Sequence, residues 1–558
     1  MVASDPEGEQ LMWTSVSTLG DIVDRQAEIS PGTALVIGNT RLSYPELSQR
    51  TDQFAASLIG LGVKAGDKVG ILMPNCLDFV LALIASAKIG AISVPINGRF
   101  KVHEAGYVID HADVAVLLTS GAAPGTDFPA LIAEVLGAAS RAHEVPNPRL
   151  LHVVSFSGDQ VGFLDRNAFE QAGVGVESSA VKTMQSRVRV RDIALLMYTS
   201  GTTARPKGCL LTHEAIGRQG EKIAKTRLML TSEDSFWDPL PLFHCGGIVP
   251  MFGVFSAGAT YCHAGHFDPT ESLQTIAAEK CTVLYPSFEA IWLPILNHPD
   301  FGTTDLSHVR LIQNIATPER MAQYEKRMPW ARQVTSYGST ECATNLTMGH
   351  PDDPLNIRIS TLGRVVDGME AKIVDPETGD EVPAGTMGEL CFRGYSCFEG
   401  YYKDPAQTAA SFDDEGFFHS GDRASIDPDG IMRFGGRLKD MLKIGGENAA
   451  ALEIEDFLAR HEAIRVVQIV GVPDEKYGEV AAAFVELNDG HALSVAQLWQ
   501  FCLDSIASYK VPRYLRIVSD WPMSGTKIKK FELRAALAAE LSAAGIKAAP
   551  DIRSAEPI

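Results

Sequence analysis

The N-terminal part of the chain alternates between two hydrophobic patterns. Apolar positions over 47–59 recur at helical spacing after Ser43 and Pro45, which are typical of a helix start. The pattern next predicts a strand over 69–73, a helix over 77–89, a strand over 91–95 and, after another helix, a strand over 114–118. Alternating strands and helices favour a parallel sheet covered by helices.

The same alternation returns further along the chain. Strands predicted at 193–198, 259–261 and 283–285 indicate a second α/β layer. Residues 375–402 place Gly, Pro and Thr between short apolar runs, which predicts a small β-rich unit. After residue 437, helices near 452–458, 495 and 531 and strands at 466–472 and 480–487 predict an α+β domain.

Chain length requires more than one hydrophobic core. A chain of 558 residues exceeds what a single core usually organises. We predict an α/β fold with a large N-terminal domain, residues 1–438, made of packed helix-covered sheets and the β-rich unit. A small α+β C-terminal domain, residues 439–558, follows a linker at 437–440.

Charge and cysteine usage narrow the possible partners and the compartment. A net charge of −20 opposes binding to a nucleic acid backbone. Residues 1–10 lack the basic start and apolar run of a signal peptide, and the apolar stretch 77–89 is too short to cross a bilayer. The nine cysteines form no CxxC pair. We therefore expect free thiols in a cytoplasmic protein.

The strongest candidate for chemistry follows the strand predicted at 193–198. The segment 198–208 reads Tyr-Thr-Ser-Gly-Thr-Thr-Ala-Arg-Pro-Lys-Gly. Its hydroxyls, glycine and cation suit a triphosphate and belong to Thr199, Ser200, Gly201, Thr202, Thr203 and Lys207. The spacing is not that of a Walker loop. Composition alone is equally compatible with a flexible surface loop.

This segment resembles the phosphate-loop signature of the adenylate-forming superfamily of acyl-CoA synthetases, adenylation domains and beetle luciferases. Further signatures follow in the family's order: Pro-Leu-Phe-His at 241–244, Tyr-Gly-Ser-Thr-Glu at 337–341, His-Ser-Gly-Asp at 419–422, Gly-Arg-Leu-Lys-Asp at 436–440, Lys-Ile-Gly-Gly-Glu-Asn at 443–448, Ala-Ser-Tyr-Lys-Val-Pro-Arg at 507–513 and Lys-Ile-Lys-Lys at 527–530. The similarity runs from about residue 41 to 534 and indicates the acyl-CoA ligase branch.

The resemblance implies a two-step reaction with ATP, Mg²⁺ and CoA. A hydrophobic carboxylic acid is first converted into an acyl-adenylate with release of pyrophosphate. The acyl group then passes to the CoA thiol, and AMP leaves. A mobile C-terminal domain that turns about Lys439 would let one chain serve both steps.

The resemblance also assigns roles to residues. Glu341 resembles the magnesium carboxylate and Thr340 the phosphate-binding hydroxyl, and Tyr337 would stack on adenine. Without this context a Tyr-Gly turn would be read as a hairpin. The other implied nucleotide-binding residues are Ala316, Thr317, Pro318, Gly338, Ser339, Asp422, Arg437 and Lys443, and Gly445 and Gly446 would line the thiol tunnel.

Lys527 resembles the lysine that bridges the substrate carboxylate and the α-phosphate during adenylation. The chain departs from the family pattern here, because Thr526 stands where Gly is common. Lys529 and Lys530 therefore stay as alternatives. Ala204 and Ala451 are further departures that change no charge needed for chemistry.

An apolar stretch after residue 236 is the predicted acid site. His244 would lie at the junction between the acid pocket and the thiol tunnel. The pocket would be lined by Trp237, Phe243, Gly247, Ile248, Phe288 and Asn314. Taken alone, an aromatic stripe is more typical of a plain core.

Several other functions share these motifs. An amino-acid adenylation domain is disfavoured, because Asp238 is the only nearby acid and no carrier segment is seen. An acyl-AMP ligase that loads a carrier protein or forms an amide is the main alternative, and a silent nucleotide-binding protein is another. A homodimer is common among such proteins.

Overall fold

The computed structural model describes residues 17–141, 149–158, 160–199, 206–444, 447–503, 505–506, 508–524 and 527–552. By packing, the chain divides into two compact units. The first unit comprises Met1–Glu370 and Arg393–Phe418, and the second comprises Ala371–Phe392 and His419–Ile558. Residues 371–392 thus group with the C-terminal part of the chain, although we predicted a β-rich unit belonging to the N-terminal domain. The position of a hinge stays a prediction.

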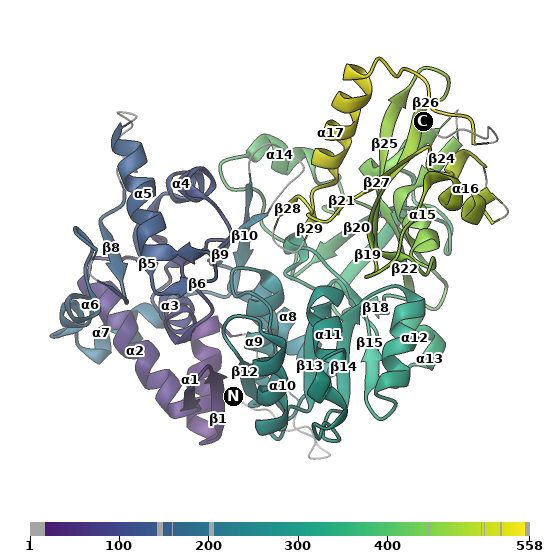
Figure 1. Cartoon of the computed structure of the whole chain (residues 1–558). Helices are drawn as coiled ribbons and strands as arrows, with labels where there is room; N and C mark the ends of the chain where they lie inside the picture. Colours follow the sequence, from purple (N-terminus) through teal and green to yellow (C-terminus); the bar gives the residue numbers. More distant parts are fainter. Residues whose placement is uncertain are drawn as a thin grey trace. The chain divides into compact units, whose positions relative to one another are not determined.

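A six-stranded sheet forms one layer of the first unit, in the order β10-β9-β4-β3-β5-β8. Its strands are β3 (Lys68–Leu72), β4 (Ile92–Pro95), β5 (Val114–Thr119), β8 (His152–Ser155), β9 (Ile193–Thr199) and β10 (Lys207–Thr212). All neighbours run parallel except β9 and β10, which are antiparallel. Helices α4 (Val102–His111) and α5 (Phe128–Arg141) pack beside this sheet, where Val108, Ile132 and Leu196 share one buried cluster (Figure 1).

A seven-stranded sheet forms another layer, in the order β15-β14-β13-β11-β12-β1-β2. Its strands are β1 (Thr33–Ile37), β2 (Thr40–Ser43), β11 (Ser235–Trp237), β12 (Thr260–His263), β13 (Val283–Phe288), β14 (Leu311–Ile315) and β15 (Arg332–Val334). Only β2 runs antiparallel to its neighbour. The carboxyl ends of the parallel strands therefore meet at one edge, where open α/β sheets usually bind ligands.

The remaining elements of the first unit are short strands and helices. The strands are β6 (Ala122–Ala123), β7 (Thr126–Asp127), β16 (Ser336–Tyr337), β17 (Thr347–Met348) and β18 (Arg364–Val365). The helices are α1 (Leu19–Ile29), α2 (Tyr44–Gly60), α3 (Leu77–Lys88), α6 (Arg166–Gly173), α7 (Ser178–Gln185), α8 (His213–Thr226), α9 (Cys245–Ala257), α10 (Pro269–Ala278), α11 (Glu289–Leu296), α12 (Pro318–Arg327), α13 (Leu355–Ser360) and α14 (Pro405–Ala410), with 3₁₀ turns η1 (Pro299–Gly302) and η2 (Thr340–Cys342).

A buried cation ties the first three helices together. Lys88, at the end of α3, is fully buried, and its Nζ lies 2.6 Å from Asp24 of α1 and 2.5 Å from Asp52 of α2. Burial works against ionisation of Asp24, but the two lysines Lys88 and Lys182 outweigh it and lower the pKa of Asp24 to about 2. An ammonium buried in this way needs both carboxylates, because an unpaired buried charge is costly.

The second unit contains one four-stranded sheet and an α+β part. The sheet has the order β19-β20-β21-β22. Its strands are β19 (Met369–Val374), β20 (Gly388–Gly394), β21 (Phe418–Ile426) and β22 (Met432–Arg437). The α+β part comprises β23 (Met441–Ile444), β24 (Glu447–Ala450), β25 (Ile464–Asp474), β26 (Gly478–Leu487), β27 (Tyr514–Ile517), β28 (Met523–Ser524), β29 (Lys527–Ile528), α15 (Ala451–Leu458), α16 (Val495–Leu503), α17 (Lys530–Ala543), η3 (Leu438–Asp440) and η4 (Ser508–Lys510).

The mixed α/β fold is confirmed, and most predicted elements lie within two residues of their expected bounds. The helix predicted after Ser43 and Pro45 is confirmed as α2, in which Ser43 forms a capping box with Glu46 and the proline stands in the first turn. All nine cysteines are free thiols. Among the described residues, no helix combines the length and apolar character needed to cross a membrane.

Candidate active site

The carboxyl ends of neighbouring parallel strands bring several predicted site residues together in the first unit. Strand β13 ends at Phe288, and β14 ends just before Ala316, Thr317 and Pro318. Strand β15 leads within three residues to Tyr337. Thr317 caps α12 by accepting a hydrogen bond from the Arg320 amide. The predicted adenine-binding segments therefore lie at one sheet edge.

A buried chain of hydrogen bonds connects these strand ends. The Ser287 hydroxyl donates to Gln313 Oε1 at 2.7 Å, and Gln313 Nε2 donates to the Ser336 hydroxyl at 2.9 Å. Ser336 contacts Asn345 Oδ1 at 3.4 Å, and Asn345 Nδ2 donates to the Tyr285 hydroxyl at 2.6 Å. These residues were not predicted from the sequence. Their side chains fix the backbone on both sides of Tyr337.

The turn after Tyr337 depends on a glycine. A Cβ atom at Gly338 would lie 1.3 Å from the carbonyl oxygen of Thr344. Two non-glycine residues, Ala343 and Thr344, adopt positive φ angles of 48° and 87° to close this turn. Ser339 begins the η2 turn, which carries Thr340 and Glu341. The backbone here is shaped so that Glu341 is held on a short, tightly closed segment.

Strands β9 and β10 frame the predicted phosphate loop. Thr199 and Lys207 pair directly across the hairpin, and the Thr199 hydroxyl lies 3.5 Å from the Lys207 carbonyl oxygen. Ser200, Gly201, Thr202 and Thr203 lie outside the described residues. The two ends of the loop are thus adjacent, as a phosphate-binding hairpin requires.

Tyr401 connects the loop cation to the predicted magnesium carboxylate. The Lys207 ammonium lies 5.0 Å from the centroid of the Tyr401 ring, and the Tyr401 hydroxyl donates to Glu341 Oε1 at 3.2 Å. Burial, together with the nearby Glu341 carboxylate, raises the pKa of Tyr401 well above its usual range, so the hydroxyl stays protonated. Residues around Tyr401 pair with β10, since the Tyr402 amide donates to the Gly208 carbonyl at 2.7 Å.

Sequence reasoning missed Tyr401. A Gly-Tyr-Tyr triplet after a run of short strands carries no signal beyond that of a turn. A polar aromatic residue that follows a β-rich segment and adjoins a candidate phosphate loop could have been flagged only after the pairing with β10 was known.

The second unit pairs two predicted nucleotide-binding residues. Asp422 on β21 and Arg437 on β22 are directly opposite in register, and Arg437 Nε lies 3.2 Å from Asp422 Oδ1. Asp422 is buried, whereas Arg437 is exposed. Lys439 lies in η3 and Lys443 in β23, and their side chains are not described. Gly445 and Gly446 lie outside the described residues.

The three C-terminal lysines lie in different surroundings. Lys527 is exposed on β29, whose partner strand is β28. Lys530 Nζ lies 2.6 Å from the buried Glu455, and Lys529 pairs with Glu532 at 3.0 Å, three residues further along the chain. Lys529 and Lys530 therefore each have a carboxylate partner within the second unit, and the choice of Lys527 for a role towards substrate stays a prediction.

The predicted acid-pocket residues differ in burial. Phe243, His244 and Phe288 are half-buried, and His244 and Phe288 immediately precede α9 and α11. Trp237, Ile248 and Asn314 are buried. A Cβ at Gly247 would lie 2.7 Å from the Pro241 carbonyl oxygen, so this glycine allows a close backbone approach. Of these predicted pocket residues, only the half-buried ones could contact a substrate without a rearrangement of side chains.

Asp238 has no free carboxylate for a substrate ammonium. It is fully buried, and it accepts from the Leu240 amide at 2.8 Å and from the Tyr261 hydroxyl at 3.2 Å. Burial raises the pKa of Asp238 well above its usual range. A neutral, buried carboxylic acid would not bind a substrate ammonium. Adenylation of an amino acid therefore stays disfavoured.

Comparison with known proteins agrees with this geometry. A sequence model described as AMP-binding enzyme matches residues 23–402, and one described as AMP-binding enzyme C-terminal domain matches 453–527. A Bacillus subtilis (strain 168) protein, YngI, named as a candidate acyl-CoA synthetase, is 35% identical over 93% of this chain and 96% of its own length. The mitochondrial medium-chain acyl-CoA ligase ACSF2 of Rattus norvegicus is 31% identical over 93% of this chain and 87% of its own length.

A solved structure extends the similarity to three dimensions. The anthranilate CoA ligase AuaEII in complex with anthranoyl-AMP matches with a TM-score of 0.82 and 27% identity, covering 94% of this chain and 98% of its own. The family similarity inferred from ordered motifs thus covers both sequence and fold. This chain belongs to the AMP-binding enzyme family, in its acyl-CoA ligase branch.

Proposed function

We propose that this AMP-forming acid–thiol ligase activates a hydrophobic carboxylic acid with ATP and transfers the acyl group to CoA. One observation supports the proposal most strongly. Lys207, at the end of the phosphate loop, and Glu341 both contact Tyr401. A cation and a carboxylate held together beside such a loop suit a triphosphate and its counter-ion.

The first step would form the acyl-adenylate. A carboxylate oxygen of the acid attacks the α-phosphorus of ATP, the bond to the β-phosphate oxygen breaks, and pyrophosphate leaves with the electron pair. Negative charge builds up at the α-phosphate during this step, and cations such as Lys207 and Lys527 would stabilise it. In the second step the CoA sulfur attacks the acyl carbon, AMP leaves, and the thiol proton passes to solvent.

Glu341 would hold Mg²⁺, and the hydroxyl of Thr340 would bind phosphate. Oxygen donors are the ligands that Mg²⁺ prefers, and it usually takes one or two carboxylates together with phosphates and waters. Bound there, Mg²⁺ would neutralise charge on the phosphates. The Tyr401 hydroxyl would keep the Glu341 carboxylate oriented, since it donates to one of its oxygens.

Residues of the second unit would complete the reaction. Asp422 would accept hydrogen bonds from the ribose hydroxyls, and Arg437 would contact ribose or phosphate. Lys527 would bridge the substrate carboxylate and the α-phosphate. Lys439 would serve as the hinge about which residues 439–558 turn, and Gly445 and Gly446 would line the path of the thiol.

The acid would be hydrophobic. Phe243 and Phe288 offer partly exposed aromatic surface near the strand ends, and His244 would gate the passage to the thiol. Relatives are named for medium-chain acids and for anthranilate, which are both largely apolar acids. We propose an aliphatic, aryl or alicyclic acid of this kind as the substrate. We further propose that the enzyme acts in the cytoplasm as a homodimer, and light scattering would measure the mass of the particle in solution.

Isotope exchange between pyrophosphate and ATP tests the first step. Purified protein is given ATP, Mg²⁺ and a panel of medium-chain, aryl and alicyclic acids, and label incorporation into ATP is measured. Adding CoA to the best acid should yield a thioester detectable by mass spectrometry. Exchange with none of the acids would overturn the proposal, whereas exchange without thioester formation would favour a carrier protein or an amine as the acceptor.

A further inference from the structure

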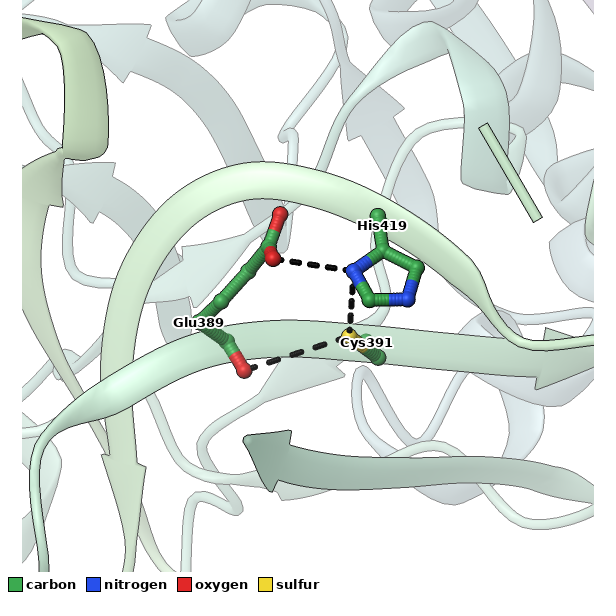
Figure 2. Close-up of side chains that lie close together, drawn as sticks. All are labelled: Glu389, Cys391 and His419. Carbon is green, nitrogen blue, oxygen red and sulfur yellow. Dashed lines mark hydrogen bonds and ion pairs between the residues drawn. The ribbon is translucent and has the colours of Figure 1, made fainter. Parts of the chain in front are cut away.

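Three potential metal ligands converge on one face of the four-stranded sheet in the second unit. Glu389 and Cys391 are two residues apart on β20, so their side chains point to the same face. His419 comes from the neighbouring strand β21. Figure 2 shows the three side chains pointing toward one another. None of them is a residue to which the ligase reaction assigns a role above.

Their ligand atoms are already close together. His419 Nδ1 lies 2.9 Å from Glu389 Oε2 and 3.4 Å from Cys391 Sγ, and the ligand atoms of all three residues lie within 4.8 Å of one another. Around a tetrahedral Zn²⁺ ion, bond lengths of about 2.0–2.3 Å place such atoms about 3–4 Å apart. Only small side-chain shifts would admit the ion.

The surroundings support the ligands. The second carboxylate oxygen of Glu389 accepts from the Gly421 amide at 2.9 Å, which fixes the carboxylate as the outer contacts of a metal site do. Cys391 is buried and the Glu389 side chain is 12% exposed, but the His419 side chain is 31% exposed. Solvent can therefore reach the cluster from the histidine side and supply a fourth ligand.

We propose that Glu389, Cys391 and His419 form a Zn²⁺ site that ties β20 to β21. Thiolate, imidazole and carboxylate together favour Zn²⁺ over the hard cations Mg²⁺ and Ca²⁺. The ion would displace the Cys391 thiol proton to solvent, and the His419 imidazole would bind the ion through Nδ1 with its own proton on Nε2. Because the tie joins neighbouring strands, its main effect would be to stabilise the sheet against unfolding.

Cobalt provides the most direct test. The full-length protein is stripped with a chelator and titrated with Co²⁺ alone, and we expect one equivalent to give a thiolate-to-cobalt charge-transfer band that Zn²⁺ then bleaches. The band should be lost in Cys391→Ser and His419→Ala and kept in Cys397→Ser, a matched control at a half-buried cysteine of the first unit. No band in the wild type, or a band that survives Cys391→Ser, would overturn the proposal.

Two further measurements separate metal binding from folding. Glu389→Gln keeps an acceptor for the Gly421 amide but removes the charge, and it should weaken Zn²⁺ binding by at least about tenfold. With chelator present, Cys391→Ser should unfold at the wild-type temperature. With Zn²⁺ present, only the wild type should unfold at a higher temperature, and an equal rise in both proteins would contradict the site.

Discussion

The Tyr401 hydroxyl donates a 3.2 Å hydrogen bond to the Glu341 carboxylate, although the two residues are 60 positions apart in the chain. The ring of the same tyrosine lies under the Lys207 ammonium. One side chain thus contacts both charged groups that the proposed adenylation step requires. Its hydroxyl and its ring can be tested separately.

Tyr401→Phe should lower the pyrophosphate exchange rate by roughly tenfold, because a hydrogen bond to a charged group contributes about 1.5–3 kcal/mol. Tyr401→Leu should lower it further, since the ring beneath Lys207 is also lost. Tyr402→Phe is the matched control, because its hydroxyl donates to Asp113 instead. Equal rates for Tyr401→Phe and wild type would remove Tyr401 from the site.

Gly338→Ala should destabilise the turn that carries Glu341. Its methyl group would overlap the Thr344 carbonyl, so backbone must move, at a cost of about 1–3 kcal/mol. We expect a lower urea midpoint and a higher KM for ATP. Gly302→Ala, where a Cβ meets nothing within 4 Å, should change neither quantity. A wild-type KM in Gly338→Ala would show that the turn does not shape the nucleotide site.

Lys527→Ala should impair activity, whereas Lys530→Ala should impair stability. Lys527→Ala should suppress adenylation strongly, spare thioester formation from preformed acyl-AMP, and leave stability unchanged, because the residue is exposed. Lys530→Ala should lower the free energy of unfolding by about 3 kcal/mol, because it leaves Glu455 buried without its cation. Half-reaction assays and urea titrations measure both. Equal loss of the two half-reactions in Lys527→Ala would argue against its assigned role.

Acid should weaken the fold through two buried histidines. Burial lowers the pKa of His213 and of His263 to about 4. An unfolded imidazole titrates near 6.5, so the unfolded state takes up protons first, and the free energy of unfolding decreases as pH falls from about 6.5 to about 4. The decrease in the free energy of unfolding is complete once the pH is below the native-state pKa of about 4.

His213→Asn should reduce that loss by about 2–3 kcal/mol, because one of the two groups no longer titrates. Asparagine retains an acceptor for the Leu19 amide, which now donates to His213 Nδ1 at 3.3 Å. Urea midpoints between pH 7 and pH 4 measure the slope. The exposed His491→Asn should leave the slope unchanged. A wild-type slope in His213→Asn would show that folding does not lower the pKa of His213.

The sequence predicted those parts of the fold that depend on local pattern. Ser43 and Pro45 located the start of α2, and apolar runs located β3, β4 and β5 within two residues. The ordered motifs located Glu341 and its turn, because each motif is contiguous. These features depend on residues close together in the chain, which a pattern can register.

The missed features depend on contacts between distant segments. Gln313 and Ser336 are 23 residues apart, and neither carries a motif. Their role follows from the pairing of β14 with β15, which sequence spacing does not specify. The grouping of residues 371–392 with residues 419–558 has the same origin, since β20 packs beside β21, which comes later in the chain.

The Lys88 ion cluster also limits how the chain can be shortened. A truncation that starts after α1 would remove Asp24 and leave the Lys88 ammonium with Asp52 alone inside a helical core. Expression screens of shortened versions should therefore keep Leu19 and the residues after it. A fragment that contained only the ordered motifs, without α1, would be expected to aggregate before its activity could be assayed.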